Sequence, residues 1–268
     1  MRLVRAELFK IRTTSLWWIM GIILVPLYAA SILLNWLAAN VGGDAAGDND
    51  QVRVALEPVN VATNLYTSGQ YFGILVVLLL SAIVVTSEFF HLTATTTFLV
   101  TPRRESVILA KFGASVIVGL AVWAFTTVLN LIFAPLILND LGLGAQLGEP
   151  AVWRAIGLNA LAYLLWAVLG VGAGVLIRSQ IAATLVLAIT YVVGTQAIGI
   201  IFILLSNNVA KWFEKLQVIV PTTASQLMVS GTELPGNPPR WVGAAVLIAY
   251  AVVGGAVGTM ITKSRDIS

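Results

Sequence analysis

Long apolar runs separated by polar segments form the main pattern along this chain. Six of these runs are long enough to cross a bilayer as helices, since a span takes about 20 residues at about 1.5 Å of rise per residue. None of them contains Asp, Glu, Lys, Arg or His, and they lie at about 15–39, 69–86, 112–138, 155–177, 181–205 and 241–261. The first run is too long for the apolar part of a signal peptide, so we expect it to be retained. The pattern predicts an all-α polytopic membrane protein with six transmembrane helices in a single domain over 1–268.

The composition agrees with a location in lipid. Hydrophobic residues make up 59% of the 268 residues and charged residues make up 10%, whereas soluble domains carry about 25% charged residues. The sequence holds no cysteine, which excludes disulfides and thiolate metal sites. The formal net charge is +3 and the sequence pI is near 9.3. The positions of the basic residues decide whether this surplus indicates a nucleic-acid partner or membrane topology.

The basic residues divide unequally between the two sides of the predicted membrane. With the N-terminus inside, ten of them fall on the cytoplasmic side, namely Arg2, Arg5, Lys10, Arg12, Arg103, Arg104, Lys111, Arg178, Lys263 and Arg265. Five fall outside, namely Arg53, Arg154, Lys211, Lys215 and Arg240. Because cytoplasmic loops carry the excess of Lys and Arg, both termini and segment 87–111 are predicted in the cytoplasm, and 40–68 and 206–240 outside. The surplus is a topology signal, and we expect no nucleic-acid partner.

The N-terminal residues predict an amphipathic helix that lies on the membrane surface. Met1, Val4, Leu8 and Ile11 fall on one stripe of such a helix. We expect this stripe to lie in the acyl region while the polar residues face the lipid phosphates. The candidate interfacial residues are Arg2, Arg5, Glu7, Lys10 and Arg12. The alternative is a cytoplasmic extension of the first transmembrane helix with basic flanks.

Segment 87–111 is the only sizeable cytoplasmic segment between two predicted spans, and it carries the single histidine of the chain. Glu88 and His91 match one half of a di-iron Glu-x-x-His site. The second half and the two further glutamates are missing, so we expect no metal here. The alternative is a polar exit from the membrane, with Glu88 and His91 one helical turn apart. The segment also predicts a charged cytoplasmic contact surface, formed by Glu88, Arg103, Arg104, Glu105 and Lys111.

The sequence offers no catalytic motif. It contains no G-x-x-x-x-G-K-[ST] loop, no H-E-x-x-H and no G-x-S-x-G, so we expect a non-catalytic chain without a nucleotide, metal or cofactor site of its own. The spans hold neutral polar residues that could bond across helices or line a pathway, among them Asn35, Asn130, Asn159 and Gln196. Because proton-coupled carriers need ionisable groups at membrane depth, this pattern disfavours them. Sodium coupling through carbonyls and hydroxyls stays open.

Pairs of glycines four residues apart occur in three of the predicted spans. They are Gly69 and Gly73, Gly170 and Gly174, and Gly254 and Gly258. Such pairs let helix backbones approach closely. We expect most of them to pack helices within one chain, and the alternative is an interface between subunits.

Two motifs and their order along the chain carry a resemblance to a known family. The first is A-E-x-x-K-x-x-T-x-x-x-W over residues 6–17, directly before the first span. The second is E-F-x-H-x-T-x-T over residues 88–95, followed by L-V-T-P-R-R over 99–104. Together they resemble the permease subunits of bacterial ABC-2-type exporters. The sequence departs from the family at Phe90 and Leu92, where such permeases often carry Arg and Gly, so an apolar contact can replace an ion pair or tight turn there.

The resemblance implies a function and a set of partners. The N-terminal helix would be a connecting helix, and a coupling helix between spans two and three would contact two cytoplasmic ABC ATPase subunits. The residues implied in this coupling are Glu88, His91, Thr93, Pro102, Arg103, Arg104 and Glu105. A second permease copy or a similar chain would complete the transporter. ATP and magnesium would bind to the ATPase subunits.

The resemblance also implies a direction and a location. The assembly would export a hydrophobic or amphiphilic compound, drug-like or lipid-like, across the bacterial plasma membrane. A re-entrant segment containing Pro221 would precede the last span, at residues 218–223. From the residues alone, an ion-coupled carrier or channel and a non-transporting scaffold or assembly subunit stay open.

Overall fold

The computed structural model describes residues 2–45, 50–93, 104–233 and 237–264, and every secondary-structure element in these ranges is helical. Six helical stretches are long and apolar enough to span a membrane, at Leu16–Val41, Pro58–Phe90, Glu105–Asp140, Pro150–Leu176, Gln180–Asn208 and Arg240–Thr262. Each of them overlaps one predicted run. The all-α architecture with six candidate transmembrane helices is therefore confirmed.

The helices follow one another along the chain in three groups. The first group is α1 (Arg2–Thr13), α2 (Leu16–Ala45), α3 (Asp50–Ala55), α4 (Pro58–Tyr66) and α5 (Gln70–Phe90). The second is α7 (Arg104–Asp140), α8 (Pro150–Leu176), α9 (Gln180–Ile189), the π-helical turn η1 (Thr190–Gly194) and α10 (Thr195–Asn208). The third is the 3₁₀ helix η2 (Lys211–Ile219), α11 (Pro221–Val229) and α12 (Arg240–Ser264). Proline opens α4, α8 and α11, where its missing N–H costs no hydrogen bond.

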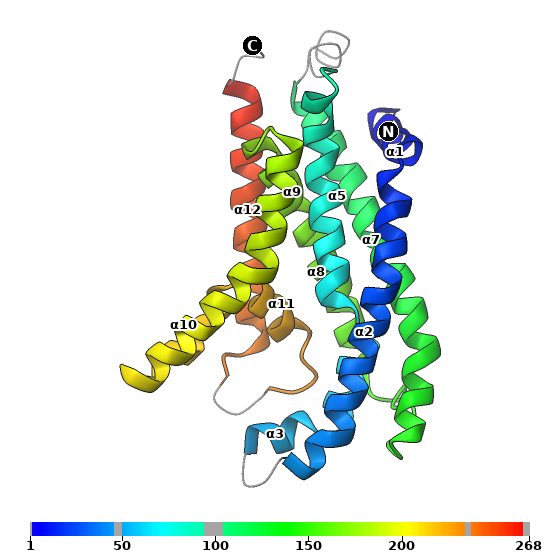
Figure 1. Cartoon of the computed structure of the whole chain (residues 1–268), viewed down its shortest axis with the longest axis vertical. Coiled ribbons are helices and arrows are strands. Elements are labelled where there is room, and N and C mark those ends of the chain that lie inside the picture. The colour runs from blue at the N-terminus through cyan, green and yellow to red at the C-terminus, as the bar shows by residue number, and fades with distance from the viewer. Residues whose placement is uncertain (1, 46–49, 94–103, 234–236, 265–268) are drawn as a thin grey trace.

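The long helices form an elongated bundle with α5 at its centre (Figure 1). α5 is largely buried and packs against α8, α7, α9 and α2. Small residues permit this packing, because a Cβ atom on Gly170 would lie 2.5 Å from the Leu78 carbonyl oxygen. A Cβ atom on Gly174 would lie 2.7 Å from the Ala82 carbonyl oxygen. The prediction that these glycines pack helices within one chain is confirmed.

A break separates α4 from α5 at residues 67–69. Gly69 adopts φ 78° at this point, a left-handed conformation that glycine takes without steric cost. Residues 58–66, which we expected in the outer segment 40–68, instead continue the second candidate span as α4. The predicted run therefore captured the buried α5 and missed the helix before it.

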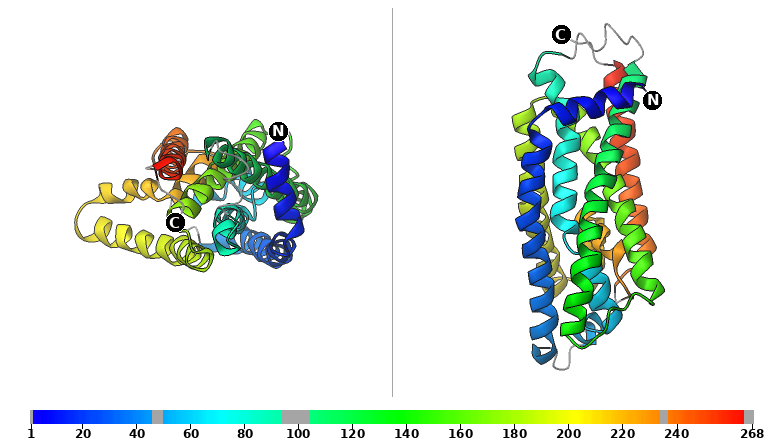
Figure 2. Two further views of the ribbon diagram at one scale, coloured as in Figure 1. Left: turned by 90° about the horizontal axis from the view of Figure 1, so that it is seen from above. Right: turned by 90° about the vertical axis from the view of Figure 1, so that its right-hand side faces the viewer.

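The fifth candidate span leaves the bundle. α9 packs against α5, but none of the residues of α10 is buried, and α10 packs mainly against η1 and η2. Figures 1 and 2 show α10 and η2 projecting sideways from the other helices. A single π-helical turn, η1, lies where the direction changes, as is common where a helix is locally distorted. This projecting pair leaves a large apolar surface of the chain uncovered.

The segment between α10 and α12 is folded. The backbone turns at Val220 and Pro221 between η2 and α11. α11 packs against α8 and α12, and the Trp166 indole N–H donates a hydrogen bond to Ser225 Oγ over 2.7 Å. The stretch that we expected to be re-entrant, 218–223, contains the junction of η2 and α11, and its re-entry into a membrane stays a prediction.

α1 lies across one end of the bundle, roughly perpendicular to the long helices (Figure 2). The end of α5, the beginning of α7 and the end of α12 lie at this same end. Residues 14 and 15 are non-helical and separate α1 from α2. The described parts of these predicted cytoplasmic segments therefore gather at one end of the molecule, and this end carries the candidate site.

Candidate functional site

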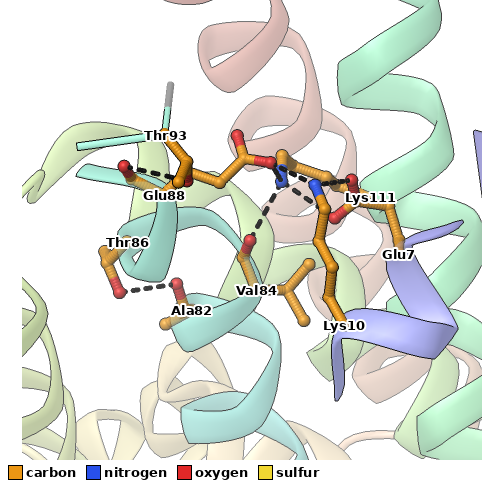
Figure 3. A network of polar contacts seen from close by, with 8 residues as sticks. All are labelled: Glu7, Lys10, Ala82, Val84, Thr86, Glu88, Thr93 and Lys111. Carbon is orange, nitrogen blue, oxygen red and sulfur yellow. Dashed lines mark hydrogen bonds and ion pairs between the residues drawn. The ribbon is translucent and has the colours of Figure 1, made fainter. Parts of the chain in front are cut away.

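Four charged side chains from three helices meet where α1 crosses the bundle. Glu7 and Lys10 come from α1, Glu88 comes from the last turns of α5, and Lys111 comes from the third turn of α7 (Figure 3). We call these four residues the tetrad. Glu7 reaches the bundle because it shares one face of α1 with Val4, Leu8 and Ile11, all three of which are half-buried. Docking this face brings the Glu7 carboxylate to Lys111.

The tetrad is joined by four ion pairs. Lys10 Nζ lies 2.7 Å from Glu7 Oε1 and 2.6 Å from Glu88 Oε1. Lys111 Nζ lies 2.9 Å from Glu7 Oε2 and 3.0 Å from Glu88 Oε1. Lys111 Nζ also donates a hydrogen bond to the Val84 carbonyl oxygen on α5 over 3.0 Å. The three donors of the Lys111 ammonium thus have three acceptors.

Most of the tetrad is shielded from solvent. Glu7 and Glu88 are each 5% exposed and Lys111 is 3% exposed, whereas the Lys10 side chain is 47% exposed. Burying a charge is costly unless it is paired and hydrogen-bonded, and the two carboxylates and two ammonium groups balance one another. Burial opposes the charge of Lys10, but its hydrogen bonds to Glu7 and Glu88 outweigh that effect and raise its pKa. The arrangement therefore favours the charged form of Lys10.

This geometry corrects two expectations about the charged segment and α1. Glu88 and Lys111 do not form an outward contact surface, because both face the interior and bind α1. The apolar stripe of α1 does not lie free for the acyl region either. Val4 packs on α7, where a Cβ atom on Gly113 would lie 3.2 Å from Val4 Cγ2. The period of the stripe indicated a buried face correctly, but the surface that covers it is the protein itself.

The outer face of α1 is basic and partly aromatic. Arg2, Arg5 and Arg12 are exposed on it, as is Phe9. The Trp17 indole N–H donates to the Arg12 carbonyl oxygen over 3.1 Å at the start of α2. Of the five candidate interfacial residues, the three arginines therefore point away from the bundle, whereas Glu7 is buried and Lys10 bridges two carboxylates.

The end of α5 forms a tight turn despite the departure at Leu92. The Thr93 N–H donates to the Glu88 carbonyl oxygen over 2.9 Å and the Leu92 N–H donates to that of Phe89 over 3.3 Å. These two bonds define a Schellman motif, whose left-handed position usually holds glycine. Leu92 occupies that position with φ 56° and is 84% exposed. The turn is kept even though leucine replaces the expected glycine.

The remaining coupling candidates divide by position. His91 and Thr93 are exposed beside the turn, and Glu105 is exposed in the first turn of α7. Arg104 is the first residue of α7, and its side chain lies outside the described part of the chain. Pro102 and Arg103 also lie outside the described residues. Among the described residues, no group of three or more His, Cys, Asp or Glu side chains could hold a metal ion.

Two of the candidate pathway residues are bound to the break between α4 and α5. Asn130 Nδ2 donates to the carbonyl oxygens of Tyr66 and Ser68 over 2.9 and 3.1 Å, and its Oδ1 accepts from the Tyr28 hydroxyl over 2.9 Å. Asn35 Nδ2 donates to Ser68 Oγ over 2.8 Å. A helix break leaves carbonyl groups without helical partners, and the Asn130 amide donates to two carbonyl groups at this break. The contacts of Asn35 and Asn130 are those of residues that bond across helices.

The other two pathway candidates have different surroundings. Asn159 is buried on α8, and its Oδ1 has no hydrogen-bond partner among the described residues. Gln196 is exposed on α10, where its side chain hydrogen-bonds the Tyr71 hydroxyl. Asn159 and Gln196 therefore do not share one site with Asn35 and Asn130 in the isolated chain.

Pairing of α1 with α7 was not predicted from the sequence. A signal was present, because Glu7 lies on the same stripe as the apolar residues of α1 and any surface that covers the stripe must also receive a carboxylate. Its partner lies 104 residues further along the chain. Comparison with protein-family models and with curated proteins finds no match to this chain.

Proposed function

We propose that this chain is the permease subunit of an ATP-driven exporter of the ABC-2 type. The observation that carries the proposal is the tetrad, because it joins α1 to the two helices that flank segment 91–104. The order of the two sequence motifs supports the same assignment. ATP and magnesium would bind to partner ATPase subunits, and this chain would hold neither.

Segment 91–104 would be the contact for two cytoplasmic ATPases. Its described flanks are exposed, with His91 and Thr93 on one side and Glu105 on the other. A push on the segment would move the end of α5 and the beginning of α7 together, since Glu88 and Lys111 are paired. ATP can drive such a change only if it binds one conformation of the assembly better than the other. The coupling role thus belongs to the exposed flanks, while Glu88 transmits the movement inward.

A second copy of this chain, or a similar chain, would cover the projecting α10. Large apolar side chains are exposed along this helix, including Ile198, Ile201 and Leu204. α10 packs mainly against η1 and η2 of its own chain, so it stands apart from the bundle that would otherwise support it. The substrate path would lie between the two copies. There Gln196 and Tyr71 would offer polar contacts to a hydrophobic or amphiphilic compound.

The proposed exporter would lie in the bacterial plasma membrane with α1 and both termini in the cytoplasm. α11 would re-enter the outer part of the bilayer, since its buried face packs on α8 and α12. The basic outer face of α1 would contact lipid phosphates.

Purification from native membranes tests the proposal. The complex should contain a soluble ATPase with a nucleotide-binding loop, and it should hydrolyse ATP. The chain alone should hydrolyse none. Efflux should follow ATP and persist when the proton gradient is collapsed. Transport driven by a pH or sodium gradient without nucleotide would favour the ion-coupled alternative and refute the exporter. Recovery of the chain without any ATPase, and without transport, would favour a scaffold.

A further inference from the structure

The tetrad contains one ion pair within α1 and one ion pair within the bundle, and each of these pairs has its own acid and its own base. Glu7 and Lys10 are both on α1 and lie 2.7 Å apart. Glu88 on α5 and Lys111 on α7 lie 3.0 Å apart. The ion pairs that join α1 to the bundle are the two cross pairs, Lys10 with Glu88 at 2.6 Å and Lys111 with Glu7 at 2.9 Å.

This division of charge lowers the cost of separating α1 from the bundle. Removing one partner of a buried ion pair is costly because the other charge is left alone. If α1 carried two acids and the bundle two bases, undocking would leave unpaired charges on both α1 and the bundle. Here each of the two elements keeps one acid and one base. Undocking therefore separates two neutral pairs, and neither loses its own counter-charge.

The packing around α1 agrees with a detachable element. A small pocket of about 60 Å³ lies beside the tetrad, between α1 and α5, and is lined by Glu7, Lys10, Trp17, Ser87 and His91 among others. Val4, Leu8 and Ile11 are only half-buried, so the apolar contact is shallow. The non-helical residues 14 and 15 separate α1 from α2 and form a natural pivot, since hinges are a few residues at the ends of elements.

We propose that α1 is a reversible latch on the ends of α5 and α7. Docked, it braces the Glu88–Lys111 pair through Lys10 and Glu7 and stiffens the junction between the end of α5 and the beginning of α7. Released, it leaves the ends of α5 and α7 joined by the Glu88–Lys111 pair alone, so that their junction is less rigid. The role of release in a transport cycle rests on the proposed function, whereas the docking equilibrium is a property of this chain alone.

Titration of Lys10 does not operate the latch in the neutral pH range. The charged groups that face Lys10 are Glu7 and Glu88, with Lys111 behind them. The pKa of Lys10 is raised above its ordinary value of 10.5. A raised pKa means that the contribution of this ammonium is fully present below 10.5 and is lost only as the pH rises further.

The first experiment measures docking in the full chain alone, in lipid nanodiscs. The natural sequence has no cysteine, so spin labels can be attached at Phe9→Cys on α1 and Phe125→Cys on α7, both of which are exposed. The distance between the labels should show one main population in the parent. Glu7→Gln with Lys10→Gln removes the α1 pair and leaves Glu88 and Lys111 paired. This double variant should fold and raise the undocked population about tenfold or more, because both cross pairs are lost.

Two results of this experiment would overturn the latch. An unchanged distance distribution in the double variant would mean that the cross pairs do not hold α1. Failure of the double variant to fold, with Glu105→Ala folding normally as the surface control, would mean that the Glu88–Lys111 pair is not sufficient without α1.

The second experiment locks α1 in the docked position within the ATPase complex. Val4→Cys with Gly113→Cys suits a disulfide, since a Cβ atom on Gly113 would lie 3.2 Å from the position of Val4 Cγ2. Oxidation should abolish substrate-stimulated hydrolysis, and reduction should restore it, while each single-cysteine variant stays active. Full activity in the oxidised complex would overturn the latch and leave the proposed function intact. Undocking in the first experiment, combined with purification of the chain from native membranes without any ATPase, would refute the proposed function and leave the latch intact.

Discussion

Replacement of Lys111 by methionine should destabilise the chain more than any other single charge removal in the tetrad. Lys111 is 3% exposed and its ammonium joins α1, through Glu7, to α5, through Glu88 and the Val84 carbonyl. Methionine fills a similar volume but donates no hydrogen bond. The variant leaves two buried carboxylates with one shared partner, Lys10, which is itself half-exposed.

The size of the effect follows from the cost of an unbalanced buried charge. Breaking a buried ion pair by removing one partner costs about 3–5 kcal/mol. Because Lys10 stays in place and water can approach it, we expect a loss of about 3 kcal/mol in the free energy of unfolding. For a chain of this size, each kcal/mol lowers the melting temperature by about 2–4 °C. Lys111→Met should therefore melt about 6–12 °C below the parent.

Thermal unfolding of the purified chain, followed by tryptophan fluorescence, measures this difference. Glu105→Ala is the matched control, because Glu105 lies on the same helix and is exposed; it should lose about 0.5 kcal/mol. Glu88→Gln combined with Lys111→Met restores charge balance and should recover part of the loss, since the two residues are in contact and their effects do not add. If Lys111→Met has the same melting temperature as the Glu105→Ala control, the tetrad does not stabilise the fold and the reasoning is wrong.

Three further outcomes follow from the described contacts. Leu92→Gly should stabilise the chain by about 0.5–1 kcal/mol, because the left-handed penalty of leucine exceeds the entropy cost of glycine; a lowered melting temperature would contradict this. Gly170→Ala should cost about 1–3 kcal/mol in unfolding free energy by overpacking, since its Cβ would lie 2.5 Å from a carbonyl oxygen. Gly157→Ala on the same helix meets nothing within 4 Å and should stabilise the chain by about 0.5–1 kcal/mol, because it removes the entropy cost of a glycine inside a helix. Cysteine at Asn237 should react with an impermeant maleimide on intact cells and cysteine at Glu105 should not; the reverse would invert the predicted topology.

The long helices could be predicted because each of them is determined by the hydrophobicity of consecutive residues. A run of about 20 apolar residues without charge has one stable arrangement in lipid, a helix whose backbone bonds are internal. α4 escaped this reasoning because it is short and lies beyond Gly69, so the break looked like the end of the span. The sequence shows Asn35 and Asn130 only as neutral polar residues within two spans. It does not show that their side chains hydrogen-bond to residues at this break.

The tetrad could not be predicted because its pairs join distant parts of the chain. The spacing of Val4, Glu7, Leu8 and Ile11 indicates that one face of α1 is covered, but amphipathicity does not say by what. A lipid surface and α7 give the same sequence pattern. The resemblance suggested that Leu92 would alter the turn at the end of α5, yet the Schellman bonds of the backbone form with leucine at φ 56°.

The self-paired charges of α1 also bear on how the protein is made. Glu7 is synthesised 104 residues before Lys111, and translation proceeds at about 5–20 residues per second. Lys111 on α7 is therefore synthesised about 5–20 s after Glu7 on α1. During that time Lys10 already neutralises Glu7 on the next turn of the same helix, so the nascent α1 can rest at the membrane surface without a partner. The two cross pairs can then be added to the two existing pairs once α5 and α7 are in place, so that all four ion pairs are present together.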